Sequence, residues 1–225
     1  MSVTERSART RRLVVMAMLI AIAYALAVAT HFLPGISVSF LKYDPKSVIV
    51  AIGGFLFGPV AALTMSVTVA VLELVTGISD TAWIGLIMNI LTTAGFACVS
   101  SFVYTKRRTV GGAIVGLAVA VVATTGLMLL WNYLVTPLYM HVDRSAVVGM
   151  LLPLFLPFNL LQGVANAALT LMLYNPLVTA LRAARLLPPS TCAPKNRRIT
   201  LWLTLVSAFV LLTALRVVRA WNGVI

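Results

Sequence analysis

Long apolar blocks alternate with short polar or basic stretches along the whole chain. The blocks predict helices over about residues 13–33, 46–57, 60–76, 83–104, 111–135 and 150–184. Most of them approach the roughly 20 residues that a helix needs to cross a bilayer. A last apolar block, residues 199–218, either spans the membrane as well or lies on its surface. The pattern predicts an all-α integral membrane protein, a six-helix transmembrane bundle with an additional C-terminal helix.

Turn residues separate these blocks. Pro34-Gly35 ends the first helix, and Gly58-Pro59 separates the second helix from the third, because this dipeptide cannot continue a regular helix. The second and third blocks are short for a bilayer and predict a tight hairpin. Two polar, aromatic loops remain, over residues 36–45 and 136–149.

The same pattern divides the chain into four parts. They are a basic N-terminal segment (1–12), the six-helix domain (13–185), a basic linker that contains prolines (186–198) and the last helix with its tail (199–225).

Composition excludes the soluble classes of protein. Of 225 residues, 61% are hydrophobic and 10% are charged, and the mean hydropathy is +1.04. Soluble domains have about 45–50% apolar and about 25% charged residues, because they cover an apolar core with a solvated shell. A soluble enzyme or a nucleic-acid-binding protein is therefore excluded.

The distribution of basic residues predicts an orientation. Lys and Arg number 17 against 5 acids, a net charge of +12. If the N-terminus is cytoplasmic and the helices alternate, 12 of the 17 fall inside and 5 outside. Lys and Arg are retained on the cytoplasmic side of membranes, so this bias predicts a multi-pass protein of the cell membrane with a cytoplasmic N-terminus.

Groups for chemistry are scarce. His31 and His141 fall near the outer surface, and Cys98 and Cys192 support neither a disulfide framework nor a zinc site. Glu73 is the one acid well within a predicted span, where it is either functional or a carboxylate that meets water or a nearby lysine. No phosphate-binding glycine loop occurs. We therefore predict no catalytic residue, no metal site and no bound cofactor.

Uncharged amides are more informative. Asn89 lies in the fourth helix and Asn132 near the outer end of the fifth, while Asn159, Gln162 and Asn166 share one face of the sixth. Such amides either bond to neighbouring helices or read the donor and acceptor edge of a neutral heterocycle without burying a charge.

Aromatic and small residues add two further patterns. Trp131, Tyr133 and Tyr139 border the region of these amides, or form part of an interfacial aromatic belt. On the first helix, Ala17, Ala21 and Ala25 recur every four residues. Small residues at this spacing let another membrane helix approach closely, so the strip is a candidate partner surface.

Four motifs occur in the order typical of one transporter family. They are Phe40-Leu-Lys-Tyr-Asp-Pro45, Gly54-Phe-Leu-Phe-Gly-Pro59, Asn132-Tyr-Leu-Val-Thr-Pro-Leu-Tyr-Met140 and Leu156-Pro-Phe-Asn-Leu-Leu-Gln-Gly163. Over about residues 13–185 the chain resembles the substrate-binding S components of energy-coupling factor (ECF) vitamin transporters, particularly the riboflavin-specific member.

The resemblance implies six helices with both ends cytoplasmic, in the plasma membrane of a prokaryote. It also implies vitamin capture at the outer face by helices four to six and the first outer loop, where the candidates are Leu41, Lys42, Tyr43 and Asp44. Its implied partners are a transmembrane coupling subunit, which docks on the alanine strip, and two ATPase subunits that use the ATP. Two departures stand out: Gln162 replaces a common family lysine, and the family usually ends before residues 199–218.

The resulting hypothesis is a riboflavin-binding S component that reorients in the membrane to deliver its ligand. Asn132 and Asn159, with Gln162 or Asn89, would read the amide edge of the flavin ring, with Tyr139 beside it. Three alternatives stay open from the residues: a pyridoxine-type or thiamine-type ligand, a small intramembrane enzyme, or a purely structural assembly subunit.

Overall fold

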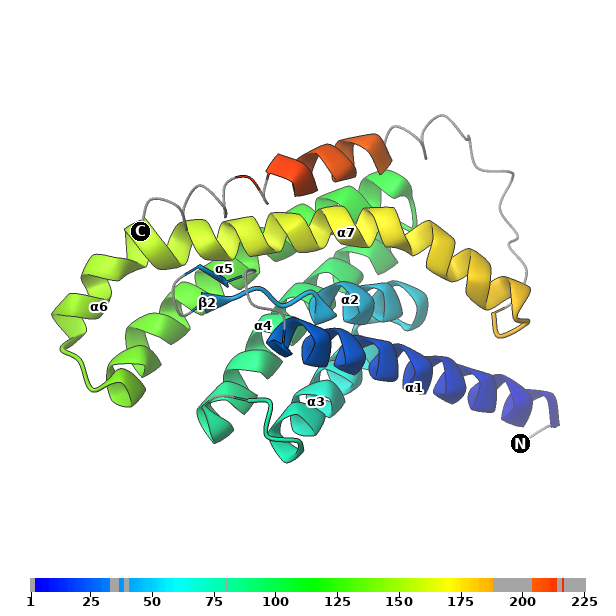
Figure 1. Cartoon of the computed structure of the whole chain (residues 1–225). Coiled ribbons are helices and arrows are strands. Elements are labelled where there is room, and N and C mark those ends of the chain that lie inside the picture. Colours follow the sequence, from blue (N-terminus) through cyan, green and yellow to red (C-terminus); the bar gives the residue numbers. More distant parts are fainter. Residues whose placement is uncertain are drawn as a thin grey trace.

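A computed structural model describes residues 3–32, 37–38, 41–79, 81–187, 204–213 and 216 of the chain. Its elements are α1 (Val3–Phe32), β1 (Ser37–Val38), β2 (Leu41–Lys42), α2 (Lys46–Phe57), α3 (Pro59–Val75), α4 (Ala82–Lys106), α5 (Val110–Met140), α6 (Arg144–Met150), the π-helix η1 (Leu151–Phe155) and α7 (Leu156–Ala183). A further short helix covers Thr204–Thr213. Figure 1 shows these elements as a bundle of long helices.

The prediction of a helical membrane protein agrees with this architecture, but the count of six spanning helices is not confirmed. In the described ranges, four helical stretches are long and apolar enough to cross a membrane: Ala8–Phe32, Ala82–Lys106, Val110–Met140 and Arg144–Ala183. The helices α2 and α3 are shorter. The only strands among the described residues, β1 and β2, form an antiparallel pair of two residues each inside the predicted first outer loop.

The prediction of a second outer loop over residues 136–149 is wrong. Helix α5 continues through Pro137 to Met140, and α6 begins at Arg144, so only three residues connect them. Prolines are tolerated inside membrane helices because neighbouring groups satisfy the freed carbonyl. Next, α6, η1 and α7 follow without a break, and in Figure 1 the α6 part bends away from the line of α7. The π-helix η1 contains Pro153. Because proline has no backbone N–H to donate, it favours a local change in the hydrogen-bond pattern of the helix.

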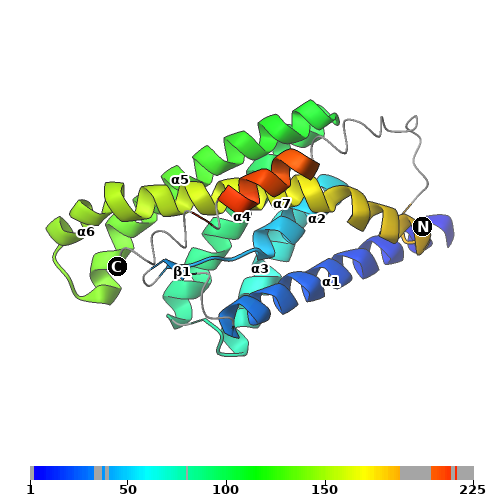
Figure 2. The same cartoon turned by 45° about the horizontal axis from the view of Figure 1, so that its top comes forward.

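Helix α2 lies at the centre of the bundle. It contacts α1, α3, α4 and α7, and its residues from Lys46 to Phe55 are all buried. In Figure 2 it lies between α1 and α7. A short helix that is apolar on nearly all sides is stable only when other helices surround it, which explains why the second apolar block need not reach across the bilayer.

Two glycines permit the turn between α2 and α3 and the close approach of α4 and α5. Gly58 has φ 93° and no heavy atom within 4 Å of an added Cβ, so it permits the predicted reversal between α2 and α3 at Gly58-Pro59. At Gly116 in α5, an added Cβ would lie 2.7 Å from the carbonyl oxygen of Ser100 in α4. The close contact between α4 and α5 therefore requires a residue without a side chain.

The structure describes parts of both predicted end segments. The basic N-terminal segment, predicted over 1–12, is helical from Val3 and continuous with α1. There Arg12 Nη2 donates to the carbonyl of Phe57 at the end of α2, with 3.3 Å between N and O. The linker is described only to residue 187, and residues 199–203 of the last apolar block lie outside the described residues. The Thr204–Thr213 helix lies alongside α7 in Figure 1 and Figure 2.

Candidate functional site

A cavity of about 440 Å³ opens among the C-terminal end of α1, the segment before α2, the turn between α3 and α4, and the facing parts of α5 and α7. Its volume falls in the range of small-molecule sites, about 300–1,000 Å³. The residues that line it are Ala27, Thr30, His31, Tyr43, Asp44, Lys46, Glu73, Ile78, Ser79, Thr81, Ile84, Gly85, Met88, Asn89, Thr92, Met128, Asn132, Tyr139, Met140, Phe158, Asn159 and Gln162.

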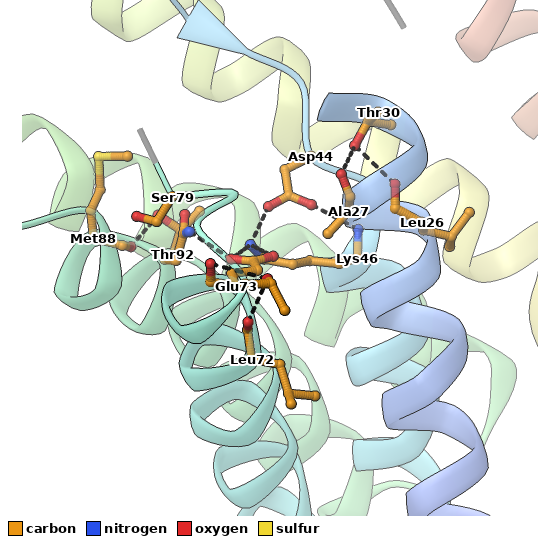
Figure 3. Close-up of polar contacts among 12 residues, drawn as sticks. Leu26, Ala27, Thr30, Asp44, Lys46, Leu72, Glu73, Ser79, Met88 and Thr92 are labelled. Carbon is orange, nitrogen blue, oxygen red and sulfur yellow. Dashed lines mark hydrogen bonds and ion pairs between the residues drawn. The ribbon is translucent and has the colours of Figure 1, made fainter. Parts of the chain in front are cut away.

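A buried charged cluster forms one wall of this cavity. Lys46 Nζ lies 2.6 Å from Asp44 Oδ2 and 2.6 and 2.7 Å from the two carboxylate oxygens of Glu73. Asn89 Nδ2 donates to Glu73 Oε2 at 2.7 Å. Figure 3 shows Asp44 and Glu73 on opposite sides of the lysine. Lys46 and Glu73 are each 2% exposed, so their ion pair is shielded from bulk water, whereas the Asp44 side chain is 26% exposed.

The sequence around Lys46 explains this arrangement. Lys46 is the first residue of α2, where the positive end of the helix dipole disfavours a cation. Asp44, two residues earlier, accepts the backbone N–H of Lys46 at 3.0 Å and pairs with its ammonium. Glu73 comes from the last turn of α3, and Asn89 comes from α4. The cluster therefore joins the segment before α2 to three helices.

Amides from α5 and α7 form another part of the cavity wall. Asn132 Nδ2 donates to the Met128 carbonyl at 2.7 Å, and its Oδ1 accepts from Thr136 at 2.9 Å. Asn159 Nδ2 donates to the Phe155 carbonyl at 2.8 Å. Asn132 is thus held by its own helix and Asn159 by the preceding π-helix η1, and each keeps hydrogen-bonding capacity in its amide.

Gln162 differs from these asparagines. Its side chain is 9% exposed and lines the cavity, and no hydrogen bond joins it to another residue of the described part of the chain. Its donor and acceptor are available to whatever occupies the cavity.

Tyr43 and Asn166 hold the segment before α2 against α7. The Tyr43 hydroxyl donates to Asn166 Oδ1 at 2.8 Å, and Asn166 Nδ2 donates to the Asp44 carbonyl at 3.4 Å. Burial raises the pKa of the Tyr43 phenol, and the neighbouring carboxylate of Asp44 adds to this effect, so the phenol stays protonated as a donor. These bonds fix one edge of the cavity.

Seven of the nine predicted ligand residues line this one cavity: Tyr43, Asp44, Asn89, Asn132, Tyr139, Asn159 and Gln162. The backbones of Leu41 and Lys42 form β2, but their side chains lie outside the described residues. Asn89 bonds to Glu73 within the charged cluster rather than standing with the other amides. Asn166, expected on the same face as Gln162, holds Tyr43 instead.

Other candidate residues lie elsewhere. Trp131 and Tyr133 do not line the cavity, and the guanidinium of Arg144 lies 5.3 Å from the centre of the Tyr133 ring. The alanine strip, Ala17, Ala21 and Ala25, is exposed on α1. In the described ranges, no group of three or more His, Cys, Asp or Glu could hold a metal ion.

Sequence reasoning missed the role of Lys46. The apolar pattern starts the second predicted helix at residue 46 and the charge count puts this lysine on the outer side, whereas in the structure Lys46 begins α2 but is buried, with 2% exposed. Two signals were present: a lysine directly after Asp-Pro at a helix start, and Glu73 as the one acid within a predicted span. Glu73 was predicted to be either functional or paired with a nearby lysine. In the structure it pairs with Lys46, and it also lines the cavity.

Comparison with known proteins bears on the role of this cavity. The family model of the substrate-specific component of ECF transporters matches residues 11–174 of the chain. The chain belongs to this family. This S component is 28% identical over 164 residues to the riboflavin transporter FmnP of Bacillus subtilis (strain 168). The matched region covers 69% of this chain and 86% of the relative.

A solved structure leads to the same family. The S component of a bacterial ECF transporter matches with a TM-score of 0.64 and 26% identity, covering 77% of this chain and 98% of the other. The expected resemblance to S components, and to a riboflavin transporter among them, is therefore confirmed. The family is that of a transporter subunit that recognises the substrate, which assigns this protein to membrane transport.

Proposed function

We propose that this S component captures riboflavin in the cavity and delivers it across the membrane as part of an ATP-driven importer. The observation that carries the proposal is the buried amide of Gln162, which lacks a described partner and faces the same cavity as Asn132 and Asn159. The similarity to a riboflavin transporter supports the choice of vitamin.

The flavin ring suits this cavity chemically. Its fused rings are flat and apolar, and one edge carries alternating carbonyl and N–H groups. Met88, Met128 and Phe158 supply apolar contact area, and the amides supply matching donors and acceptors. The bonds from Tyr43 to α7 would hold the segment before α2 closed over the bound ring.

The orientation follows from the distribution of charge along the chain. The basic residues at the start of α1 lie at one end of that helix, and Ala27, Thr30 and His31 border the cavity at its other end. With the N-terminus in the cytoplasm, the cavity faces the outside, where an imported vitamin arrives. We therefore propose the plasma membrane of a prokaryote as its location.

ATP-driven import requires partners, because the role proposed for this subunit is to capture the ligand and other subunits must hydrolyse ATP. We propose a transmembrane coupling subunit and two ATPases, with the exposed strip Ala17, Ala21 and Ala25 as the surface that meets the coupling subunit. Ala29 continues this strip at the same spacing and is exposed as well. The strip offers the smooth surface that close helix contacts in a membrane need.

Replacing Ala21 by Trp is expected to abolish uptake of riboflavin by the reconstituted importer while riboflavin binding to the isolated subunit stays unchanged. The bulky ring would hold the partner helix away from α1. The measurement is ATP-dependent uptake into proteoliposomes that contain the S component, coupling subunit and ATPases. Val119→Trp, at a site 44% exposed on α5, is the matched control and should transport normally. Full uptake by Ala21→Trp would remove the strip from the proposed interface.

A further inference from the structure

A small recess adjoins the cavity beside Gln162, among α2, α4, α5 and α7. Its volume is about 10 Å³, which is roughly the space that one water molecule requires and too little for a larger ligand. The polar residues that line it are Ser47, Thr92, Thr124, Asn159, Gln162 and Asn166. Thr92, Asn159 and Gln162 also line the cavity, so the two spaces share a wall.

Polar groups without a partner gather at this recess. The hydroxyl of Thr124 is buried and makes no hydrogen bond within the described part of the chain. The Gln162 amide, 9% exposed, has no partner among the described residues either. Ser47, in the first turn of α2 and 1% exposed, adds a second hydroxyl. A buried water makes about three hydrogen bonds, usually to groups that otherwise lack partners, and these three residues supply that number.

The position of Thr124 distinguishes it from two other threonines. Thr93 and Thr125 also have buried hydroxyls without a described partner, but neither residue lines the cavity or the recess. Thr124 lines a space that fits one water and that other polar residues share. An unpaired hydroxyl alone does not indicate a site, whereas an unpaired hydroxyl at such a space does.

Close packing encloses the recess. An added Cβ at Gly163 in α7 would lie 2.9 Å from Val121 Cγ1 in α5, and both residues line the recess. Phe96 and Asn166, from α4 and α7, line it as well and are 2% and 3% exposed. A water in this place is therefore shielded from bulk solvent and held by the protein.

We propose that the recess binds one water molecule, held by Thr124 and Ser47, which positions the Gln162 amide for the ligand. The inference rests on the proposed function, in which Gln162 meets the polar edge of the flavin ring. An amide has two donor hydrogens and an oxygen with two lone pairs, so Gln162 bonds to the water and to the ring at once. Anchoring the flexible glutamine before the ligand arrives lowers the entropy cost of binding. Thr124 and Ser47 are thus positioning residues.

The test is a riboflavin titration of the purified full-length Thr124→Val variant, which keeps the shape of the side chain and removes its hydroxyl. We expect the dissociation constant to rise roughly three- to tenfold, the effect of losing one hydrogen bond. Thr124→Ser restores a hydroxyl and should recover most of the affinity lost in Thr124→Val. If Thr124→Val fails to fold, Ser47→Ala decides, with a similar rise expected.

The matched control is Thr125→Val, which removes a buried hydroxyl that also lacks a described partner but does not line the recess. This variant should bind riboflavin as the wild type does. Wild-type affinity in Thr124→Val, or equal weakening in Thr125→Val, overturns the proposal.

The Gln162→Leu background tests whether Thr124 acts through the glutamine. Without the amide that the water positions, adding Thr124→Val should not weaken riboflavin binding further, because interacting groups have non-additive effects. If Thr124→Val weakens binding by the same factor with and without Gln162, the hydroxyl acts by another route and the proposal is overturned.

A crystal structure of the full-length chain, at a resolution that shows ordered waters, gives a readout that does not depend on riboflavin. We expect density for one water within hydrogen-bonding distance of Thr124 Oγ1 and the Gln162 amide, and a recess without it overturns the proposal. A wild-type chain that binds no riboflavin contradicts the proposed function instead, and this density then decides whether the water site exists.

Discussion

Replacing Lys46 by Met is expected to destabilise the protein by about 3–5 kcal/mol, the usual effect of removing one partner from a buried ion pair. The substitution would leave the carboxylates of Asp44 and Glu73 facing each other, with Glu73 2% exposed. It would also disconnect the segment before α2 from α3 and α4. Thermal unfolding of the purified protein in detergent measures the effect as a lower midpoint.

A double variant tests whether the loss of stability comes from the unpaired carboxylate of Glu73 or from the loss of the lysine side chain itself. Lys46→Met combined with Glu73→Leu removes both buried charges, and apolar replacements of a buried pair are often neutral. We expect this variant to recover most of the lost stability. Wild-type stability of Lys46→Met would contradict the role assigned to the cluster.

The second large effect concerns ligand binding. Replacing Gln162 by Leu is expected to weaken riboflavin binding by roughly 10- to 100-fold, because the polar edge of the bound ring would lose a partner in a buried site. The measurement is quenching of flavin fluorescence on titration of the purified variant. Stability should stay about the same, because the Gln162 side chain lines the cavity and makes no hydrogen bond to another described residue.

A neighbouring position on α7 provides the control. Leu160 is 38% exposed and does not line the cavity, so Leu160→Ala should leave riboflavin affinity unchanged. If Gln162→Leu bound riboflavin as tightly as the wild type, Gln162 would not hydrogen-bond to the polar edge of the ring. Asn132 and Asn159 would then carry the recognition without it.

Much of the site could be predicted because amides are rare in an apolar chain. Asn132, Asn159 and Gln162 stand out in sequence, and helical spacing puts the last two on one face. The cavity they share also contains Tyr43 and Tyr139. Periodicity alone could not separate Asn166 from this group, since its side chain turns to Tyr43, a contact across 123 positions of sequence.

The errors have physical causes as well. The predicted loop over residues 136–149 is wrong at its start, because α5 passes through Pro137 to Met140, and membrane helices tolerate proline where soluble helices break. The burial of Lys46 could not be predicted, because a sequence does not show that Asp44 and Glu73 converge on its ammonium. Long-range pairing of buried charges depends on how helices pack, and a local pattern does not record it.

The central claim is that the cavity binds riboflavin. Its most direct test is a titration of the full-length chain, purified and freed of bound ligand, with riboflavin, followed by competition with thiamine and pyridoxine. The account predicts saturable quenching of flavin fluorescence with a dissociation constant well below ~1 µM, a free energy stronger than about −8 kcal/mol, and no displacement by the other two vitamins. Absence of quenching at micromolar riboflavin, or displacement by thiamine or pyridoxine at equal concentration, would contradict it.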